Sequence, residues 1–196
     1  MEYIKAFVVS YNELFTIGAS GFFFKYLMSF SGLLFVVFCL TIIKAYFKKT
    51  SFSHLCLVTF VTISYLSTDY LIALEYLREA GGFIDGIVNM YLMFSLFDSI
   101  TALLIALLFP FIRKGKGYSD ASITTMCIFL INSVLHLVLL SIYITQDDFN
   151  PYLGFFYSIT VNINDLILLT AFLAPTFITK VKHLFTEKLL FLRQSD

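Results

Sequence analysis

Residues 84–112 read IDGIVNMYLMFSLFDSITALLIALLFPFI and hold only two charged side chains, Asp85 and Asp98. A helix needs about 20 mostly apolar residues to cross about 30 Å of hydrocarbon. This stretch exceeds that length, so it predicts a transmembrane helix. Asp98 lies near its middle, where a charged side chain is costly. The segment therefore indicates both the fold class and where function is to be sought.

Four further stretches of the chain meet the same criterion of length and apolarity. They flank residues 84–112 and are joined by short polar connections. Pro175 is expected to bend the last span near the membrane boundary, and residues 180–192 to prolong it as a cytoplasmic helix. The predicted spans are residues 22–47, 54–77, 84–112, 121–145 and 152–178, followed by a cytoplasmic tail over residues 179–196.

The predicted fold is an all-α, polytopic integral membrane protein, a single transmembrane domain over residues 1–196. It is a bundle of five transmembrane helices with an N-terminal interfacial amphipathic helix and a short C-terminal cytoplasmic helix. Residues 1–20 carry apolar side chains at helical spacing, with polar ones largely on another face, and these features predict the interfacial helix. A sixth span over the same residues is the alternative, but it would disturb the alternation of charge between the loops.

Composition excludes several classes of protein. Hydrophobic residues make up 59% of the chain and charged residues 13%, whereas soluble domains carry roughly 25% charged residues. A formal net charge of zero gives no reason to expect a nucleic-acid partner. Cys39, Cys56 and Cys127 are isolated, and one mid-span histidine beside an aspartate is not a catalytic triad. We therefore expect neither an enzyme nor a cofactor.

Lysine and arginine follow spans one, three and five, which predicts the orientation of the chain. The N-terminus is expected outside and the C-terminus in the cytoplasm, with the chain integral to a membrane, taken as a bacterial inner (plasma) membrane. The residues on the cytoplasmic side are Lys44, Lys48, Lys49, Arg113, Lys114, Lys116, Lys180, Lys182, Lys188 and Arg193.

Four ionisable residues lie far from the ends of the predicted spans: Asp69, Asp98, His136 and Asp165. Each is roughly 13 to 15 residues into its helix, or about 20 Å deep at about 1.5 Å per residue. Because neighbouring spans run antiparallel, the four depths are expected to coincide near the middle of the bilayer. Span one has no such residue and is expected to be peripheral.

Other polar residues lie at helical spacing from these four and are expected to face the same interior. Asparagines would supply oxygen or amide ligands, and tyrosines would line the mouths. The predicted ion or proton pathway thus contains Asp69, Asp98, His136, Asp165, Asn132, Asn162, Asn164, Tyr65 and Tyr91.

This polar layer leads to two functional hypotheses. A charge at the membrane centre costs at least about 2.5–3.5 kcal/mol. One histidine cannot balance three acids, so either some carboxyls are protonated or protons or a cation visit. The leading hypothesis is a small protein that translocates protons or small cations, as a channel or transporter. The alternative is a non-catalytic membrane subunit, sensor or assembly factor whose polar layer packs helices, and a homo-oligomer or a partner membrane subunit stays open.

Overall fold

The computed structural model describes residues 30–78, 83–145 and 151–194, with side chains over 30–71, 90–145 and 152–184. Within these ranges the chain forms six helices and no strand. They are α3 (Phe30–Tyr46), α4 (Phe52–Arg78), α5 (Phe83–Ile112), α6 (Asp120–Thr145), α7 (Pro151–Leu173) and α8 (Pro175–Gln194). The interfacial helix predicted for residues 1–20, and the sixth-span alternative, fall outside the described residues.

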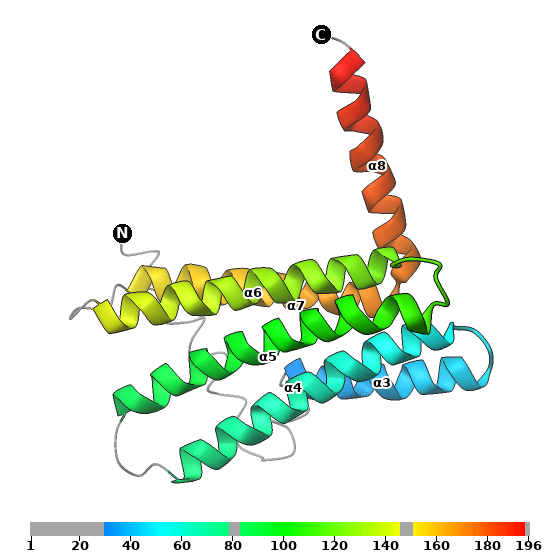
Figure 1. The fold of residues 1–196 in the computed structure, drawn as a ribbon. Coiled ribbons are helices and arrows are strands. Elements are labelled where there is room, and N and C mark those ends of the chain that lie inside the picture. The colour runs from blue at the N-terminus through cyan, green and yellow to red at the C-terminus, as the bar shows by residue number, and fades with distance from the viewer. Residues whose placement is uncertain (1–29, 79–82, 146–150, 195–196) are drawn as a thin grey trace.

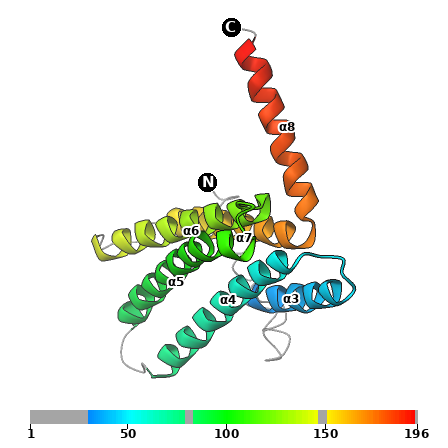
Figure 2. The same ribbon diagram turned by 45° about the vertical axis from the view of Figure 1, so that its right-hand side comes forward.

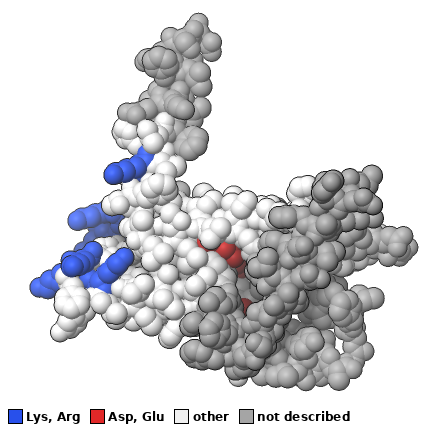
Figure 3. All heavy atoms as spheres, turned by 180° about the vertical axis from the view of Figure 1, so that it is seen from behind, with Lys and Arg blue, Asp and Glu red and all other residues white. Residues whose placement is uncertain are grey.

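Helices α3 to α7 form one bundle, and α8 projects from one end of it (Figure 1). Successive helices run in opposite directions, as their short connections require. The connections α3–α4, α5–α6 and α7–α8 therefore lie at the same end of the bundle. We call this end the basic end, because the Lys and Arg side chains visible in Figure 3 gather there.

Two helices stop at the basic end with the same local structure. Lys48 and Lys114 adopt left-handed backbone angles, with φ of 55° and 52°. The following residue in each case donates its N–H to a carbonyl five residues earlier, Lys49 to Lys44 at 2.8 Å and Gly115 to Pro110 at 2.9 Å. This is the Schellman cap, which satisfies carbonyls left over at a helix end. A lysine at this position also places positive charge at the negative end of the helix dipole.

Among the residues whose side chains the structure describes, three helices are long and apolar enough, by length and composition, to cross a membrane: Met90–Ile112, Asp120–Thr145 and Tyr152–Leu173. The apolar helix Phe30–Tyr46 has the same character but is shorter, at 17 residues. Large apolar side chains are exposed along these helices, for example Leu103, Leu107 and Leu166. In water such a surface would aggregate, whereas in a bilayer it contacts lipid tails. The length, composition and exposed apolar surface of these helices therefore indicate a helical membrane protein.

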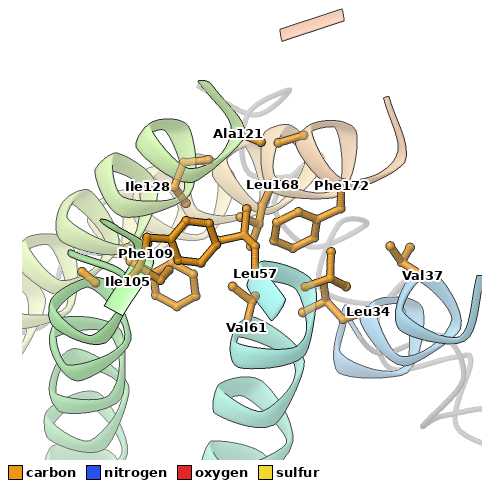
Figure 4. Packing of buried hydrophobic residues seen from close by; sticks show 14 residues of the cluster. Leu34, Val37, Leu57, Val61, Ile105, Phe109, Ala121, Ile128, Leu168 and Phe172 are labelled. Atoms are coloured by element: carbon orange, nitrogen blue, oxygen red, sulfur yellow. The ribbon is translucent and has the colours of Figure 1, made fainter. Parts of the chain in front are cut away.

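An apolar cluster fills the bundle core between the basic end and the bundle's middle (Figure 4). Helices α4 and α6 contribute from their first halves, and α5 and α7 from their last halves. Because these helices alternate in direction, all four halves lie toward the basic end. The apolar cluster consists of Leu34, Val37, Leu57, Val58, Val61, Ala102, Ile105, Phe109, Ala121, Ile128, Phe129, Leu168, Ala171 and Phe172.

The fifth apolar helix ends earlier than the sequence prediction of Ile178. Helix α7 stops at Leu173, and α8 begins at Pro175 in a new direction (Figure 2). Proline lacks the N–H that would continue the helix and disfavours helical backbone at the residue before it, here Ala174. Proline is well suited to the first position of a new helix, and it occupies that position in α8.

Two side chains from other helices complete the end of α7. His54 Nε2 on α4 lies 3.0 Å from the Phe172 carbonyl oxygen, and Lys44 Nζ on α3 lies 3.5 Å from that of Leu173. Both carbonyls have lost their intrahelical partners because the helix stops there. The geometry assigns the His54 proton to Nε2 as donor. The break at Ala174 is thus supported by contacts from two neighbouring helices.

Candidate functional site

The centre of the site is a pair formed between α5 and α6. Asp98 Oδ2 and His136 Nε2 are 3.3 Å apart, and their side chains are 12% and 5% exposed. Helices α5 and α6 form the most extensive helix–helix contact in the bundle, and these two midway residues lie opposite each other in it. The pair can hold one shared proton as a neutral acid and imidazole or as carboxylate and imidazolium. Either form avoids a lone charge in the bundle interior.

Tyr157 on α7 extends this pair into a chain of three groups. Its hydroxyl lies 2.6 Å from His136 Nδ1, on the ring side opposite Asp98. If Tyr157 donates to Nδ1, the neutral ring carries its proton on Nε2 and donates to Asp98. If both ring nitrogens are protonated, both donate. His136 is therefore held by a partner at each nitrogen, between a carboxyl and a phenol.

Aromatic rings surround the imidazole. Phe94 stacks on it with centroids 5.1 Å apart, and Tyr91 lies 6.3 Å away. Tyr91 also stacks on Tyr143 at 5.8 Å and meets Tyr157 edge-on at 5.6 Å. These rings fix the orientation of His136 and line the core on the side away from the apolar cluster. Tyr91 thus contacts the site through ring packing.

A second carboxyl lies beside this chain. The Tyr65 hydroxyl on α4 donates to Asp165 Oδ1 on α7 at 2.8 Å. Asp165 is also near enough to Asp98 for the two carboxyls to interact electrostatically. Two acids from different helices therefore share one region of the core, each with its own hydrogen-bond partner.

Two asparagines join α6 and α7 in the same region. Asn164 Nδ2 donates to Asn132 Oδ1 at 2.7 Å, and Asn132 is buried. Asn162 is partly buried on α7, one turn before Asp165. The structure therefore brings together seven side chains, here called the polar cluster: Tyr65, Asp98, Asn132, His136, Tyr157, Asn164 and Asp165.

The sequence predicts that Asp69 meets Asp98, His136 and Asp165, but the structure places Asp69 at the margin of that group. It is only partly buried, and its side chain interacts with Ser31 on α3. Its charge is close enough to influence Tyr65, so it lies at the margin of the polar cluster. Helix α3 reaches this margin through a second contact, since the Phe30 ring packs on Tyr65 with centroids 4.9 Å apart.

Hydroxyl groups bind the helices together around the polar cluster. Ser133 Oγ on α6 lies 2.9 Å from Ser95 Oγ and 2.7 Å from Ser99 Oγ on α5. Ser64 Oγ on α4 lies 2.6 Å from Thr101 Oγ1. Polar side chains that bond across helices in this way hold transmembrane helices in register.

Sequence reasoning left three of these side chains out: Tyr157, Ser99 and Ser64. Tyr157 precedes Asp165 by eight residues, which is two helical turns and about 80°, so both residues lie on the same side of α7. That spacing was an available signal. Ser99 and Ser64 lie beside the expected polar stripes, and only the rotation of each helix against its neighbours brings them into contact.

The site is bordered by the apolar cluster on the side of the basic end. Asp98 is two helical turns from Ile105, and His136 is two turns from Phe129. Asp165 is one turn from Leu168. Within the described residues, no group of three or more His, Cys, Asp or Glu side chains is placed to hold a metal ion. The chemistry available here is proton exchange and hydrogen bonding by Asp98, His136 and Asp165.

Comparison with known proteins gives no match to a protein-family model, to a curated protein or to a solved structure.

Proposed function

We propose that this chain is a five-span membrane protein that translocates protons or small cations through the polar cluster. The observation that carries the proposal is the Asp98–His136–Tyr157 chain, in which a buried imidazole has a proton-exchanging partner at each ring nitrogen. Intramembrane acids and histidines recur in proton relays. No catalytic role is proposed for any of these residues.

The proton has a stepwise route within the cluster. A proton arriving at His136 gives imidazolium, which the Asp98 carboxylate stabilises at 3.3 Å. Transfer of the Nε2 proton to Asp98 leaves a neutral acid and a neutral imidazole. Asp165, which interacts electrostatically with Asp98, is proposed as the next acceptor, with water carrying the proton between the two carboxyls. A small cation would instead displace the proton from the two carboxyls and use the amide oxygens of Asn132 and Asn164.

Orientation follows from the basic end. The described lysines and arginines gather at the end that carries the α3–α4, α5–α6 and α7–α8 connections (Figure 3). By the positive-inside rule this end faces the cytoplasm, with the N-terminus outside, and the membrane proposed is a bacterial inner membrane. The apolar cluster then lies on the cytoplasmic side of the polar cluster, as the inner barrier that must part for passage.

Proton flux into liposomes tests the proposal. The protein is reconstituted, a pH gradient is imposed, and an enclosed pH-sensitive dye reports entry. We expect flux by the native chain and its loss when Asp98→Asn and Asp165→Asn are combined. Asp120→Asn is the matched control: it makes the same chemical change outside the polar cluster, at a carboxylate paired with Lys182, and is expected to keep the flux. Equal flux from the double variant and the native chain would contradict the proposal.

A second candidate function is favoured by a different observation. Each side chain of the polar cluster has a partner within the cluster, and the cytoplasmic half of the core is packed with apolar side chains. Such an arrangement suits a non-catalytic subunit, sensor or assembly factor that binds its own copies or another membrane protein. This candidate is supported if the native chain shows no flux, co-purifies with one defined partner, and loses stability in the Asp98→Asn, Asp165→Asn variant.

A further inference from the structure

Helix α8 has a direction that the rest of the bundle does not share. It begins at Pro175 and runs crosswise to the bundle in both ribbon views, starting from the basic end (Figures 1 and 2). A helix that leaves a transmembrane bundle crosswise at the membrane boundary lies along the membrane surface. This geometry follows from the break at Ala174 and rests on the proposed bilayer placement, but not on proton movement.

An ion pair fixes the direction of α8 against α6. Lys182 Nζ lies 2.6 Å from Asp120 Oδ1, at the first residue of α6. The Thr179 side chain interacts with the same carboxylate. The base of α8 is therefore attached on two sides, to α7 through Ala174 and to α6 through Asp120.

The described part of α8 carries one apolar face. Phe177, Val181 and Leu184 are spaced by four and three residues, so they lie on one side of the helix. Phe177 is 54% exposed and Leu184 is 63% exposed, because the helix has left the bundle. Two large apolar side chains exposed together on a crosswise helix are typical of helices that lie in the membrane interface.

Basic groups flank this apolar face: Lys180 borders it, four residues before Leu184, and Lys182 lies about 140° around the helix from Phe177. In Figure 3 a blue side chain on the projecting helix points away from the body of the bundle, on the same side as the blue side chains of the basic end. Lys180 and Lys182 thus extend the basic end along the start of α8. Such a surface complements the anionic headgroups of the cytoplasmic leaflet.

We propose that α8 is a lipid-binding helix, lying in the interface of the cytoplasmic leaflet with Phe177 and Leu184 among acyl chains and its lysines on anionic phospholipid headgroups. The Asp120–Lys182 ion pair sets its angle to the bundle. The occupant of the apolar face is phospholipid, because α8 leaves the bundle crosswise at the basic end, where the described lysines and arginines complement anionic headgroups (Figures 1 and 3).

The chain has no tryptophan, so the fluorescence of a single introduced tryptophan can be assigned to one position. Leu184→Trp places the probe on the apolar face, and His183→Trp places it about 100° around the helix. Each full-length variant is reconstituted into phosphatidylcholine vesicles with or without phosphatidylglycerol, and with or without brominated acyl chains that quench tryptophan on contact. Proton flux of both variants is measured in parallel. A failure of the proposed lipid binding by α8 is then distinguished from a failure of the proposed proton translocation.

Interfacial helices bury their apolar faces about 5–10 Å deep, so we expect quenching about twofold greater at residue 184 than at residue 183. Phosphatidylglycerol should raise quenching at residue 184, and high salt should reverse that increase. Equal quenching at both positions would overturn the interfacial placement. If phosphatidylglycerol leaves the quenching at residue 184 unchanged, the proposed preference of α8 for anionic phospholipid is overturned. A blue-shifted but unquenched probe at residue 184 would show a protein contact, such as a second copy, and would overturn the proposal.

Discussion

The polar cluster and the apolar cluster are two halves of one core, built by the same helices and held by different forces. Ser95 borders the polar cluster and Ala102 belongs to the apolar cluster; both lie on α5, two turns apart and each 4% exposed. Burial therefore does not distinguish the two halves. In a bilayer, lipid is as apolar as the core, so the apolar cluster is stabilised by close packing, whereas the polar cluster depends on matched partners.

The largest effect on stability is expected in the apolar cluster. Phe129→Ala removes a side chain that is 1% exposed and leaves a cavity, which should lower the free energy of unfolding by about 3 kcal/mol. The measurement is reversible unfolding in mixed micelles followed by circular dichroism. Phe156→Ala is the matched control, since Phe156 is 65% exposed to the lipid side. Similar losses from both variants would show that the apolar cluster is not closely packed.

A smaller loss is expected when one partner is removed from the polar cluster. Asp98→Leu leaves His136 Nε2 buried without its acceptor and should cost about 2 kcal/mol. Asp98→Asn keeps a hydrogen-bonding group of the same shape and should cost less than about 1 kcal/mol. The same unfolding measurement compares them. If the leucine variant is as stable as the native chain, the Asp98–His136 pair does not hold the bundle.

The helical fold and the depth of the ionisable residues could be predicted because both depend on spacing along the chain. Asp98, His136 and Asp165 lie midway along apolar stretches, and antiparallel neighbours bring equal depths together. The choice of partner could not be predicted. Tyr157 reaches His136, and Asp69 turns to Ser31, because each helix is rotated by the packing of all its neighbours, which one sequence does not specify.

The end of α7 shows the same limit at the level of the backbone. Pro175 indicated a bend, but the number of residues before the break depended on how the chain closes its last turn. His54 and Lys44, distant in sequence, supply the partners that allow α7 to stop at Leu173. A signal confined to the proline could not reveal these contacts.

The hydroxyl contacts beside the polar cluster should have a moderate effect. Ser133→Ala removes the bonds to Ser95 and Ser99 and should cost about 1 kcal/mol, since interhelical bonds in membranes average about 0.6 kcal/mol each. Ser141→Ala makes the same change on α6, where the Ser141 hydroxyl donates to the Leu137 carbonyl of its own helix. It should leave stability nearly unchanged. Equal effects would show that the contacts between α5 and α6 carry no specific energy.

The smallest effect is expected at the basic end, outside both clusters. His54→Ala removes a donor to the Phe172 carbonyl and should cost about 0.5–1 kcal/mol. Combining it with Lys44→Ala should add a few tenths of a kcal/mol, roughly the contribution of a cation at a helix C-terminus. Calorimetry of the reconstituted protein can resolve such changes. If His54→Ala lowers the free energy of unfolding more than Phe129→Ala does, the α7–α8 junction contributes more to the stability of the bundle than the packing of the apolar cluster.

Side-specific chemical labelling tests most directly whether the two halves of the core differ in access to water. In a background with Cys39, Cys56 and Cys127 replaced by alanine, single cysteines are placed at Ser95 and Ala102, which share a helix face and the same burial. A small thiol reagent that needs water is applied to either side of oriented vesicles. We predict labelling of Ser95→Cys from the outer side and none of Ala102→Cys from either side. Labelling of Ala102→Cys from the cytoplasmic side, or none of Ser95→Cys, would contradict an outward-accessible polar cluster sealed by the apolar cluster.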